Sequence, residues 1–302
     1  MQFVNMLVAH AITWLPRALV RHISRRYIAG NNLEEAVIRV RELNALGLTV
    51  TIDVLGETPI NASQVTDTAN QYVQVLQAID ALGLNAGISV KPTALGLLLD
   101  PVQCERLFAQ IACLAQSVQR PVCMDMEDVQ CTQMEIDLFS RLKQGSDTLG
   151  LAVQAYLKRS YNDIEKLLAL NSTLRICKGI YVEGKEYLVP HSWHDRSAIN
   201  SHFVHHVTRC FDVGVFVEIA THDEALIHQI IGITQQRGIA RTQFEFQMLL
   251  GVCEPLRDRL LEAGFQVRIY VPFGEDWYAY SVRRLKENPR IVGYIMKAML
   301  RI

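Results

Sequence analysis

Short apolar runs rich in Val and Ile alternate with longer amphipathic stretches along most of the chain. Consecutive apolar residues are typical of parallel strands that are buried on both faces. We predict such strands at 48–57, 85–92, 120–127, 149–157, 174–181, 213–222, 242–249 and 265–274. The stretches between them repeat apolar residues at helical spacing. We predict helices at 64–82, 101–117, 131–144, 162–170, 195–211, 222–237 and 253–263.

Glycines stand just before several of the predicted strands, where helix C-caps and tight turns favour them. They are Gly47, Gly83, Gly150, Gly214 and Gly264. Eight successive strand–helix units without an evident linker predict an α/β fold, a single (β/α)8 TIM-type barrel, because parallel strands need crossovers of this length. An open doubly wound sheet is the alternative. No GxGxxG motif follows the first strand, which favours the barrel.

The composition indicates one large folded unit. The chain has 302 residues, of which half are apolar and one fifth charged, and its formal net charge is -1. A near-neutral chain is not expected to bind nucleic acid through bulk electrostatics. We predict a single domain over 1–302, with N-terminal helices in 1–30, the barrel in 31–288 and a final helix over the barrel mouth in 289–302.

Cysteines and the N-terminal stretch bear on location. The seven cysteines are scattered, odd in number and never spaced as CxxC, which indicates reduced thiols in a cytoplasmic protein rather than disulfides or a zinc ribbon. The apolar N-terminal run precedes its basic residues and contains Pro16, so it is a poor signal peptide or membrane span. We expect amphipathic helices there, with contact to a membrane surface as the alternative.

Polar residues follow the apolar runs at the predicted strand exits. In a barrel, the carboxyl ends of the strands carry the chemistry. One such residue is more often part of a structural ion pair, but polar groups at all eight exits predict a mixed-charge pocket. These residues are Asp53, Glu57, Lys91, Asp125, Glu127, Gln154, Arg175, Lys178, Thr221, His222, Gln247 and Tyr270.

Histidine placement gives little support for a metal site. The first strand carries no histidine, whereas zinc-dependent barrel hydrolases usually place an HxH motif there. His202, His205 and His206 share the i, i+3, i+4 spacing of one helix face, and His191 and His194 precede them. This spacing permits a metal site, but we favour a solvated helix face and predict no metal.

Arg283 and Arg284 stand side by side on a predicted helix. Adjacent guanidinium groups repel each other, so we expect an anion between them. A carboxylate would suit this pair, because guanidinium groups bind carboxylates through two parallel hydrogen bonds.

Seven ordered motifs between about residues 27 and 288 carry a family resemblance. They are SVKPTALG, MDMED, QAYLKR, RICKGIY, EIATHDEAL, FEFQMLLGV and RIYVPFGEDWYAYSVRRLKEN. The chain resembles the proline dehydrogenases, FAD enzymes that oxidise L-proline to Δ1-pyrroline-5-carboxylate, the first step of proline catabolism to glutamate. It is most similar to the monofunctional bacterial form.

The resemblance implies roles for residues that match the motifs. It implies that Lys91, Asp125, Arg175 and Tyr270 are catalytic. It implies substrate contacts for Lys91, Asp125, Leu249, Tyr270, Tyr280, Arg283 and Arg284, with the arginine pair on the proline carboxylate. It implies FAD contacts for Asp125, Gln154, Arg175, Lys178, Thr221, His222 and Gln247, and Glu245 lies in a motif that also lines the flavin pocket.

The resemblance also implies a quinone as electron acceptor and hence peripheral contact with the inner face of the cell membrane. Two positions depart from the usual family pattern, Pro92 after the lysine and Ile180 in KGIY. Alternative functions are a 4-hydroxyproline dehydrogenase and a catalytically silent barrel that only binds ligands. Tyr270 disfavours the first, since hydroxyproline-preferring relatives tend to have a small residue there.

Overall fold

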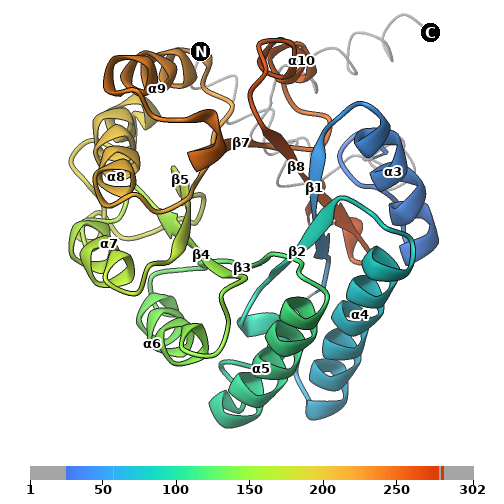
Figure 1. Cartoon of the computed structure of the whole chain (residues 1–302). Coiled ribbons are helices and arrows are strands. Elements are labelled where there is room, and N and C mark those ends of the chain that lie inside the picture. Colours follow the sequence, from blue (N-terminus) through green and yellow to red (C-terminus); the bar gives the residue numbers. More distant parts are fainter. Residues whose placement is uncertain (1–24, 57, 279, 282–302) are drawn as a thin grey trace, which may run out of the picture.

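The computed structural model describes residues 25–56, 58–278 and 280–281. Eight parallel strands form a closed barrel in chain order, with β1 paired to both β2 and β8 (Figure 1). The barrel prediction is therefore confirmed, and the open-sheet alternative is wrong. The strands are β1 (Thr49–Val54), β2 (Ala86–Val90), β3 (Val122–Met124), β4 (Leu149–Gln154), β5 (Thr173–Cys177), β6 (Val217–Ala220), β7 (Phe244–Leu249) and β8 (Val267–Phe273).

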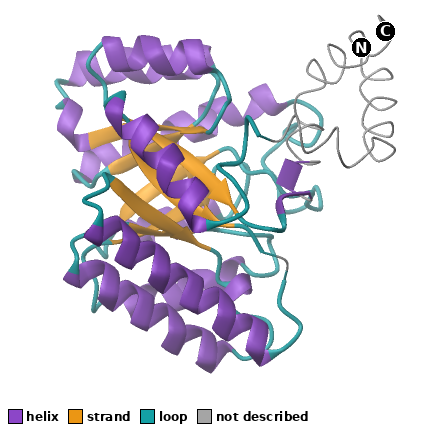
Figure 2. Cartoon of the chain, turned by 90° about the vertical axis from the view of Figure 1, so that its right-hand side faces the viewer, coloured by secondary structure: helices purple, strands orange, loops and turns teal. Residues whose placement is uncertain are grey.

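Helices surround the strands on the outside of the barrel (Figure 2). All seven predicted helices are present, with ends that differ from the predicted ones by a few residues. They are α4 (Ala62–Ala81), α5 (Pro101–Ser117), α6 (Thr132–Lys143), α7 (Ser160–Leu168), α8 (Asn200–Val213), α9 (Glu224–Arg237) and α10 (Glu254–Glu262). Single 3₁₀ turns, η1 (Thr93–Leu95), η2 (Arg196–Ile199) and η3 (Arg241–Gln243), precede α5, α8 and β7.

One further helix, α3 (Leu33–Ala45), precedes β1 and was not predicted. The Asn32 side chain accepts the backbone N–H of Glu35, and the Glu35 carboxylate accepts that of Asn31. This reciprocal arrangement resembles a capping box. Ala36, Val40 and Leu43 form its buried stripe, which packs on β1 and β8. The helical spacing was present in the sequence, but no strand preceded it to mark a strand–helix unit.

Four of the five predicted turn glycines have the left-handed backbone that favours glycine: Gly47, Gly83, Gly214 and Gly264 have φ between 60° and 83°. Gly150 was wrongly placed in a turn, since it lies inside β4. A Cβ at Gly150 would meet the backbone oxygen of Thr173 on β5 at 3.0 Å. Glycine is thus favoured there by a close approach between neighbouring strands.

Alternation along each strand separates two environments. In β1, Val50 and Ile52 are fully buried, whereas Asp53 lines the cavity at the carboxyl end of the barrel. Because successive strand residues point to opposite faces, the apolar positions face the helices and the polar ones face the barrel interior. The apolar helix–sheet layer stabilises the fold, while the interior is available for polar chemistry.

The structure describes only part of the predicted N-terminal segment. Residues 25–30 form a turn and an irregular segment, and the helices expected in 1–24 and 289–302 lie outside the described residues. In the described part of the chain, no helix is both long and apolar enough to cross a bilayer. All seven cysteines are free.

Candidate active site

A cavity of about 790 Å³ opens at the carboxyl ends of the strands. Its lining includes every described residue to which we had assigned a catalytic, substrate or cofactor role. These are Lys91, Asp125, Gln154, Arg175, Lys178, Thr221, His222, Gln247, Leu249, Tyr270 and Tyr280. Glu245 lies beneath the lining, while Glu57, Arg283 and Arg284 lie outside the described residues. The barrel therefore brings together eleven polar and apolar groups from seven strands and the segment after β8.

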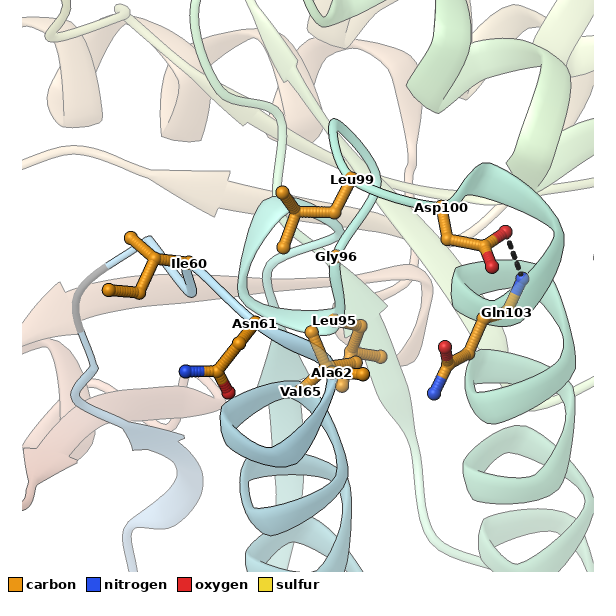
Figure 3. Close-up of a pocket in the computed structure, with 9 residues that line it drawn as sticks. All are labelled: Ile60, Asn61, Ala62, Val65, Leu95, Gly96, Leu99, Asp100 and Gln103. Atoms are coloured by element: carbon orange, nitrogen blue, oxygen red, sulfur yellow. Dashed lines mark hydrogen bonds between the residues drawn. The ribbon is translucent and has the colours of Figure 1, made fainter.

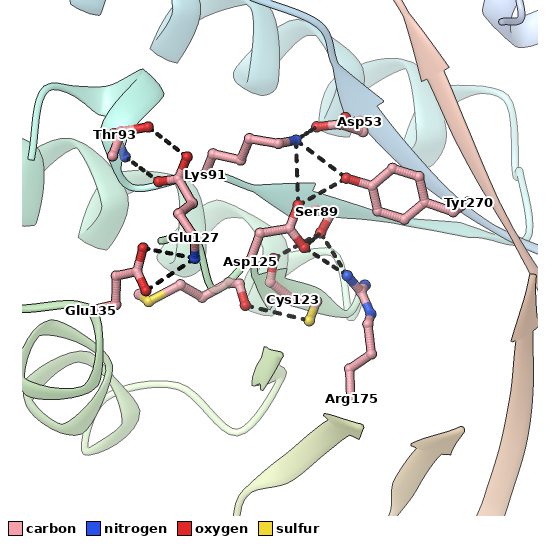
Figure 4. Close-up of polar contacts among 11 residues, drawn as sticks. Asp53, Ser89, Lys91, Thr93, Cys123, Asp125, Glu127, Glu135, Arg175 and Tyr270 are labelled. Atoms are coloured by element: carbon pink, nitrogen blue, oxygen red, sulfur yellow. Dashed lines mark hydrogen bonds and ion pairs between the residues drawn. The ribbon is translucent and has the colours of Figure 1, made fainter. Parts of the chain in front are cut away.

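Lys91 contacts three other polar side chains at the cavity floor (Figure 4). Its Nζ donates to Asp53 Oδ1 at 2.7 Å and to the Tyr270 hydroxyl at 3.3 Å, and it lies 3.3 Å from Asp125 Oδ2. The Tyr270 hydroxyl donates to Asp125 Oδ2 at 2.8 Å. The ends of four strands, β1, β2, β3 and β8, are thus joined by charge-assisted hydrogen bonds, which are the stronger kind.

Arg175 enters the same network from β5. Its Nη1 donates to Asp125 Oδ1 at 2.7 Å and to Ser89 Oγ at 3.0 Å, and its Nε donates to Glu218 Oε2 at 3.3 Å. Its Nη2 is buried and has no hydrogen-bond partner in the described structure. A buried unpaired donor is costly, so a ligand that supplies an acceptor at this point would be stabilised.

Electrostatics keep this network charged. Burial alone would raise the pKa of Asp125, but the neighbouring Lys91 and Arg175 outweigh it and lower the pKa below the ordinary range. Burial would lower the pKa of Lys91, yet the carboxylates of Asp53 and Asp125 hold it well above its usual value. Burial beside two carboxylates raises the pKa of the Tyr270 phenol. At neutral pH the floor therefore presents two cations, an ionised Asp125 and a neutral phenol.

Beneath the floor, a row of charges follows the strand register. Arg175 of β5 pairs in register with Glu218 of β6, which pairs with Glu245 of β7. Arg268 of β8 donates to Glu245 and to the backbone oxygen of Val50. Acidic and basic groups in this interior layer compensate each other and fix the Arg175 guanidinium from below.

The rim of the cavity carries two further cations. Lys178 Nζ donates to Asp223 Oδ2 at 2.8 Å, and Arg196 Nη2 donates to the backbone oxygen of Gly179 at 2.7 Å. His222 Nε2 accepts the backbone N–H of Leu249 at 2.9 Å, which joins the exits of β6 and β7. Through Asp223, the N-cap of α9, Lys178 lies near the N-terminus of that helix, where anions are favoured.

Sequence reasoning missed several residues of this arrangement. Ser89, Glu218 and Arg268 lie inside strands, and Arg196 lies in a 3₁₀ turn. A polar side chain within an otherwise apolar strand was the only available signal for the first three. Arg196 lies outside the strands and carried no comparable signal.

The histidine cluster differs from both of its sequence interpretations. No group of three or more His, Cys, Asp or Glu side chains is arranged to hold a metal ion among the described residues. The preferred solvated face is wrong for His206, which is only 1% exposed. His206 packs edge-on against the Tyr161 ring at 4.7 Å between centroids, and Tyr161 hydrogen-bonds His202 Nδ1 at 2.6 Å.

A second pocket of about 240 Å³ lies beside the barrel, between the start of α4 and the loop that leads into α5 (Figure 3). Its lining includes Ile60, Val65, Leu95 and Leu99. The Asp100 carboxylate at its edge is engaged as the N-cap of α5. This pocket lacks the converging charged groups of the larger cavity, which is therefore the candidate active site.

The chain is similar to a family of known proteins. A family model described as Proline dehydrogenase matches residues 36–295. Proline dehydrogenase 1 of Bacillus subtilis (strain 168) is 33% identical over 278 residues, which cover 92% of this chain and 91% of that protein. Proline dehydrogenase of Deinococcus radiodurans is 29% identical over 296 residues, 95% of this chain and 93% of its own length.

A solved structure shares the fold. Proline utilization A (PutA) from Bdellovibrio bacteriovorus, inactivated by N-propargylglycine, matches with a TM-score of 0.82 and 21% sequence identity. The match covers 89% of this chain and 33% of that protein, so the chain spans about a third of its length. At this identity the comparison shows a common barrel architecture.

Proposed function

The chain belongs to the proline dehydrogenase family, and from that premise we propose that it oxidises L-proline to Δ1-pyrroline-5-carboxylate with FAD as cofactor. The observation that carries this proposal is the linked set of Lys91, Asp125, Arg175 and Tyr270 at the floor of one cavity. A volume of about 790 Å³ falls in the range of roughly 300–1,000 Å³ that small-molecule sites occupy.

The substrate offers a carboxylate and a ring amine. Asp125, held ionised by its two cations, would orient the amine, while Leu249 and the Tyr270 ring provide apolar surface for the carbon ring. We assign the carboxylate to Arg283 and Arg284, a bidentate pair suited to its geometry. Tyr280 lines the cavity and is three residues before the first of these arginines.

The residues present fit a flavin. The unpartnered Nη2 of Arg175 is a buried donor in the lining of the cavity, and a flavin ring has acceptor atoms for it. FAD, when bound, would accept the hydride that leaves the proline carbon next to nitrogen. The fixed positive charge of Arg175 would stabilise negative charge on the reduced ring, an effect that is stronger in a closed site than in water.

The rim residues suit the rest of the cofactor. Lys178 and Arg196 would face the negative diphosphate, in keeping with the preference of helix N-termini for anions. Gln154, Thr221, His222 and Gln247 line the same cavity. We assign them to the ring and its attached chain.

Electron transfer out of the site completes the proposal. We propose a quinone as the acceptor, with peripheral contact at the inner face of the cell membrane and entry of the product into glutamate synthesis. The motif resemblance supports this step. Reoxidation of the reduced protein by a soluble quinone, faster than by dioxygen, is the expected result of a stopped-flow comparison.

The experiment that tests the function is a visible spectrum recorded before and after anaerobic addition of L-proline. The purified protein should show flavin absorbance that bleaches with proline. Acid precipitation should release the flavin as FAD. A protein that binds no added FAD would favour a catalytically silent barrel instead.

A further inference from the structure

Glu127 joins three strand exits of the cavity, although its own side chain has no assigned role; Figure 4 shows its contacts with Thr93 and Glu135. Its Oε2 accepts the backbone N–H of Thr93 at 3.0 Å, and its Oε1 accepts the Thr93 hydroxyl at 2.6 Å. Its backbone oxygen accepts Gln154 Nε2 at 2.6 Å. Thr93 follows Lys91 by two residues, and Glu127 follows Asp125 by two. One residue therefore connects the segments that carry Lys91, Asp125 and Gln154.

Glu135 fixes Glu127 from the side of α6. Its two carboxyl oxygens lie 3.1 and 3.2 Å from the backbone nitrogen of Glu127 and accept its N–H. The side chain is fully buried. Burial, with Glu127 nearby, raises the pKa of Glu135 to about 9, so this second carboxyl is neutral at pH 7. The backbone N–H and C=O of Glu127 and both of its side-chain oxygens are thus engaged at once.

A purely structural role explains this arrangement poorly. The Glu127 residue is only 8% exposed, and its carboxylate takes its hydrogen bonds from a single threonine. Burying a carboxylate costs free energy that an apolar side chain of similar size would not. A rigid network of hydrogen bonds fixes the distances between loops, whereas apolar packing only fills space.

We propose that Glu127 and Glu135 form a carboxyl bracket that positions Lys91 and Gln154 around Asp125. Here the bracket means these two residues together with Thr93. Glu127 and Glu135 are positioning residues, since they act through Thr93 and through the backbone of the loop after β3. This inference rests on the proposed function for its kinetic consequences, because it assigns Lys91 to the proline side and Gln154 to the flavin side of one site.

Variants of Thr93 and Glu127 separate the bracket from general stability. Thr93→Val keeps the branched shape but removes the hydroxyl donor, whereas Thr93→Ser retains it. Glu127→Gln removes the charge and replaces one of the two oxygens that accept hydrogen bonds from Thr93 with an amide nitrogen that only donates. The control is Asp128→Asn in the same loop, because Asp128 accepts the N–H groups of Gln130 and Cys131 nearby rather than joining strand exits.

We expect Glu127→Gln and Thr93→Val to raise KM for proline and to weaken FAD binding, each by about tenfold to a hundredfold. Thr93→Ser and Asp128→Asn should stay close to the wild type in both constants. The measurements are KM and kcat per bound flavin, FAD titration of the apoprotein, and Tm on the same preparations. If the first two variants lower Tm yet leave KM and FAD affinity unchanged, the positioning role is overturned.

Hydrogen exchange of the ligand-free protein tests the bracket without catalysis. The amides of Thr93 and Glu127 should exchange faster in Glu127→Gln than in the wild type and in Asp128→Asn. If exchange is unchanged at both amides, the bracket does not hold these loops and the inference fails. A wild type that binds no FAD but shows the expected exchange pattern would instead refute the proposed function alone.

Discussion

Tyr270 shows how one residue serves the site in two ways. Its hydroxyl bridges Lys91 and Asp125, and its ring lies against two cations, with Lys91 Nζ 5.9 Å and Arg175 Cζ 5.5 Å from the ring centroid. The sequence resemblance implied a catalytic role and a substrate contact for Tyr270, but not the partners of its hydroxyl. The hydroxyl contacts depend on the register between β8 and its neighbours across the barrel.

Separate substitutions divide these two roles of Tyr270. Tyr270→Ser should open space beside the proline ring and reduce discrimination against trans-4-hydroxyproline by about 10- to 200-fold. Tyr270→Phe keeps the ring and should preserve discrimination while raising KM, because Asp125 loses a hydrogen bond. The ratio of kcat/KM for the two imino acids is the measurement. Wild-type selectivity in the Ser variant would show that Tyr270 is not the selectivity element.

The arginine pair should act on substrate and not on cofactor. Arg283→Met or Arg284→Met should raise KM for proline at least tenfold, since loss of one partner of a buried charged pair costs about 2–5 kcal/mol. FAD content should remain near normal. Lysine replacements should restore affinity only in part, because an ammonium cannot reproduce the guanidinium fork.

If these residues instead cap a helix or pair with barrel carboxylates, the methionine variants would lose thermal stability and keep their KM. Both quantities should therefore be measured on the same preparations. Lower stability with an unchanged KM would remove the carboxylate assignment.

At the scale of elements, periodicity predicted the strands and most helices because each buries one continuous apolar surface. It predicted residues at strand exits for the same reason, since the end of an apolar run is visible in the sequence. It did not reveal α3, or that Gly150 lies within β4. Partners such as Ser89, Glu218 and Arg268 were not predictable, because their pairing depends on how eight strands align after closure.

The loop after β5 contains a glycine at which an added methyl group would clash with a neighbouring side chain. Gly179 has φ +96°, and a Cβ there would lie 2.3 Å from the Tyr156 ring. Gly179→Ala should shift the segment that carries Lys178 and receives the Arg196 hydrogen bond. We expect FAD affinity to fall by about tenfold or more, measured by titration of the apoprotein.

Gly214→Ala is the matched control for Gly179→Ala. It has φ +81° and no atom within 4 Å of the added methyl group, so it carries backbone strain of about 1 kcal/mol without a clash. It should lower Tm slightly and leave FAD affinity unchanged. Equal FAD affinities in the two variants would show that the position of the loop after β5 does not govern cofactor binding.

For the whole molecule, buried titratable groups outside the cavity floor set opposite pH trends. The pKa of Glu135 is raised to about 9 by burial and by Glu127, above an ordinary value of about 4.3. Its contribution to stability is complete below the unfolded pKa and declines as pH rises toward 9. Glu135→Gln, which cannot ionise, should therefore gain stability relative to the wild type between pH 5 and pH 8. Urea unfolding at both pH values checks this; a constant difference would contradict it.

His206 should produce the opposite trend at acidic pH. Burial, with His205 and His202 adding to it, lowers the pKa of His206 to about 4, below an ordinary value of about 6.5. The unfolded chain takes up a proton first as the pH falls, so stability present above pH 6.5 is lost toward pH 4, by up to about 3 kcal/mol.

His206→Phe keeps a ring against Tyr161 and cannot be protonated, so its free energy of unfolding should depend less steeply on pH across this window. The exposed His228→Gln variant, on α9, controls for histidine loss in general and should follow the wild-type curve. The difference between the wild-type and His206→Phe curves of unfolding free energy against pH isolates this group, because all other titrations are common to both. Parallel curves would mean that His206 is not held neutral by the fold.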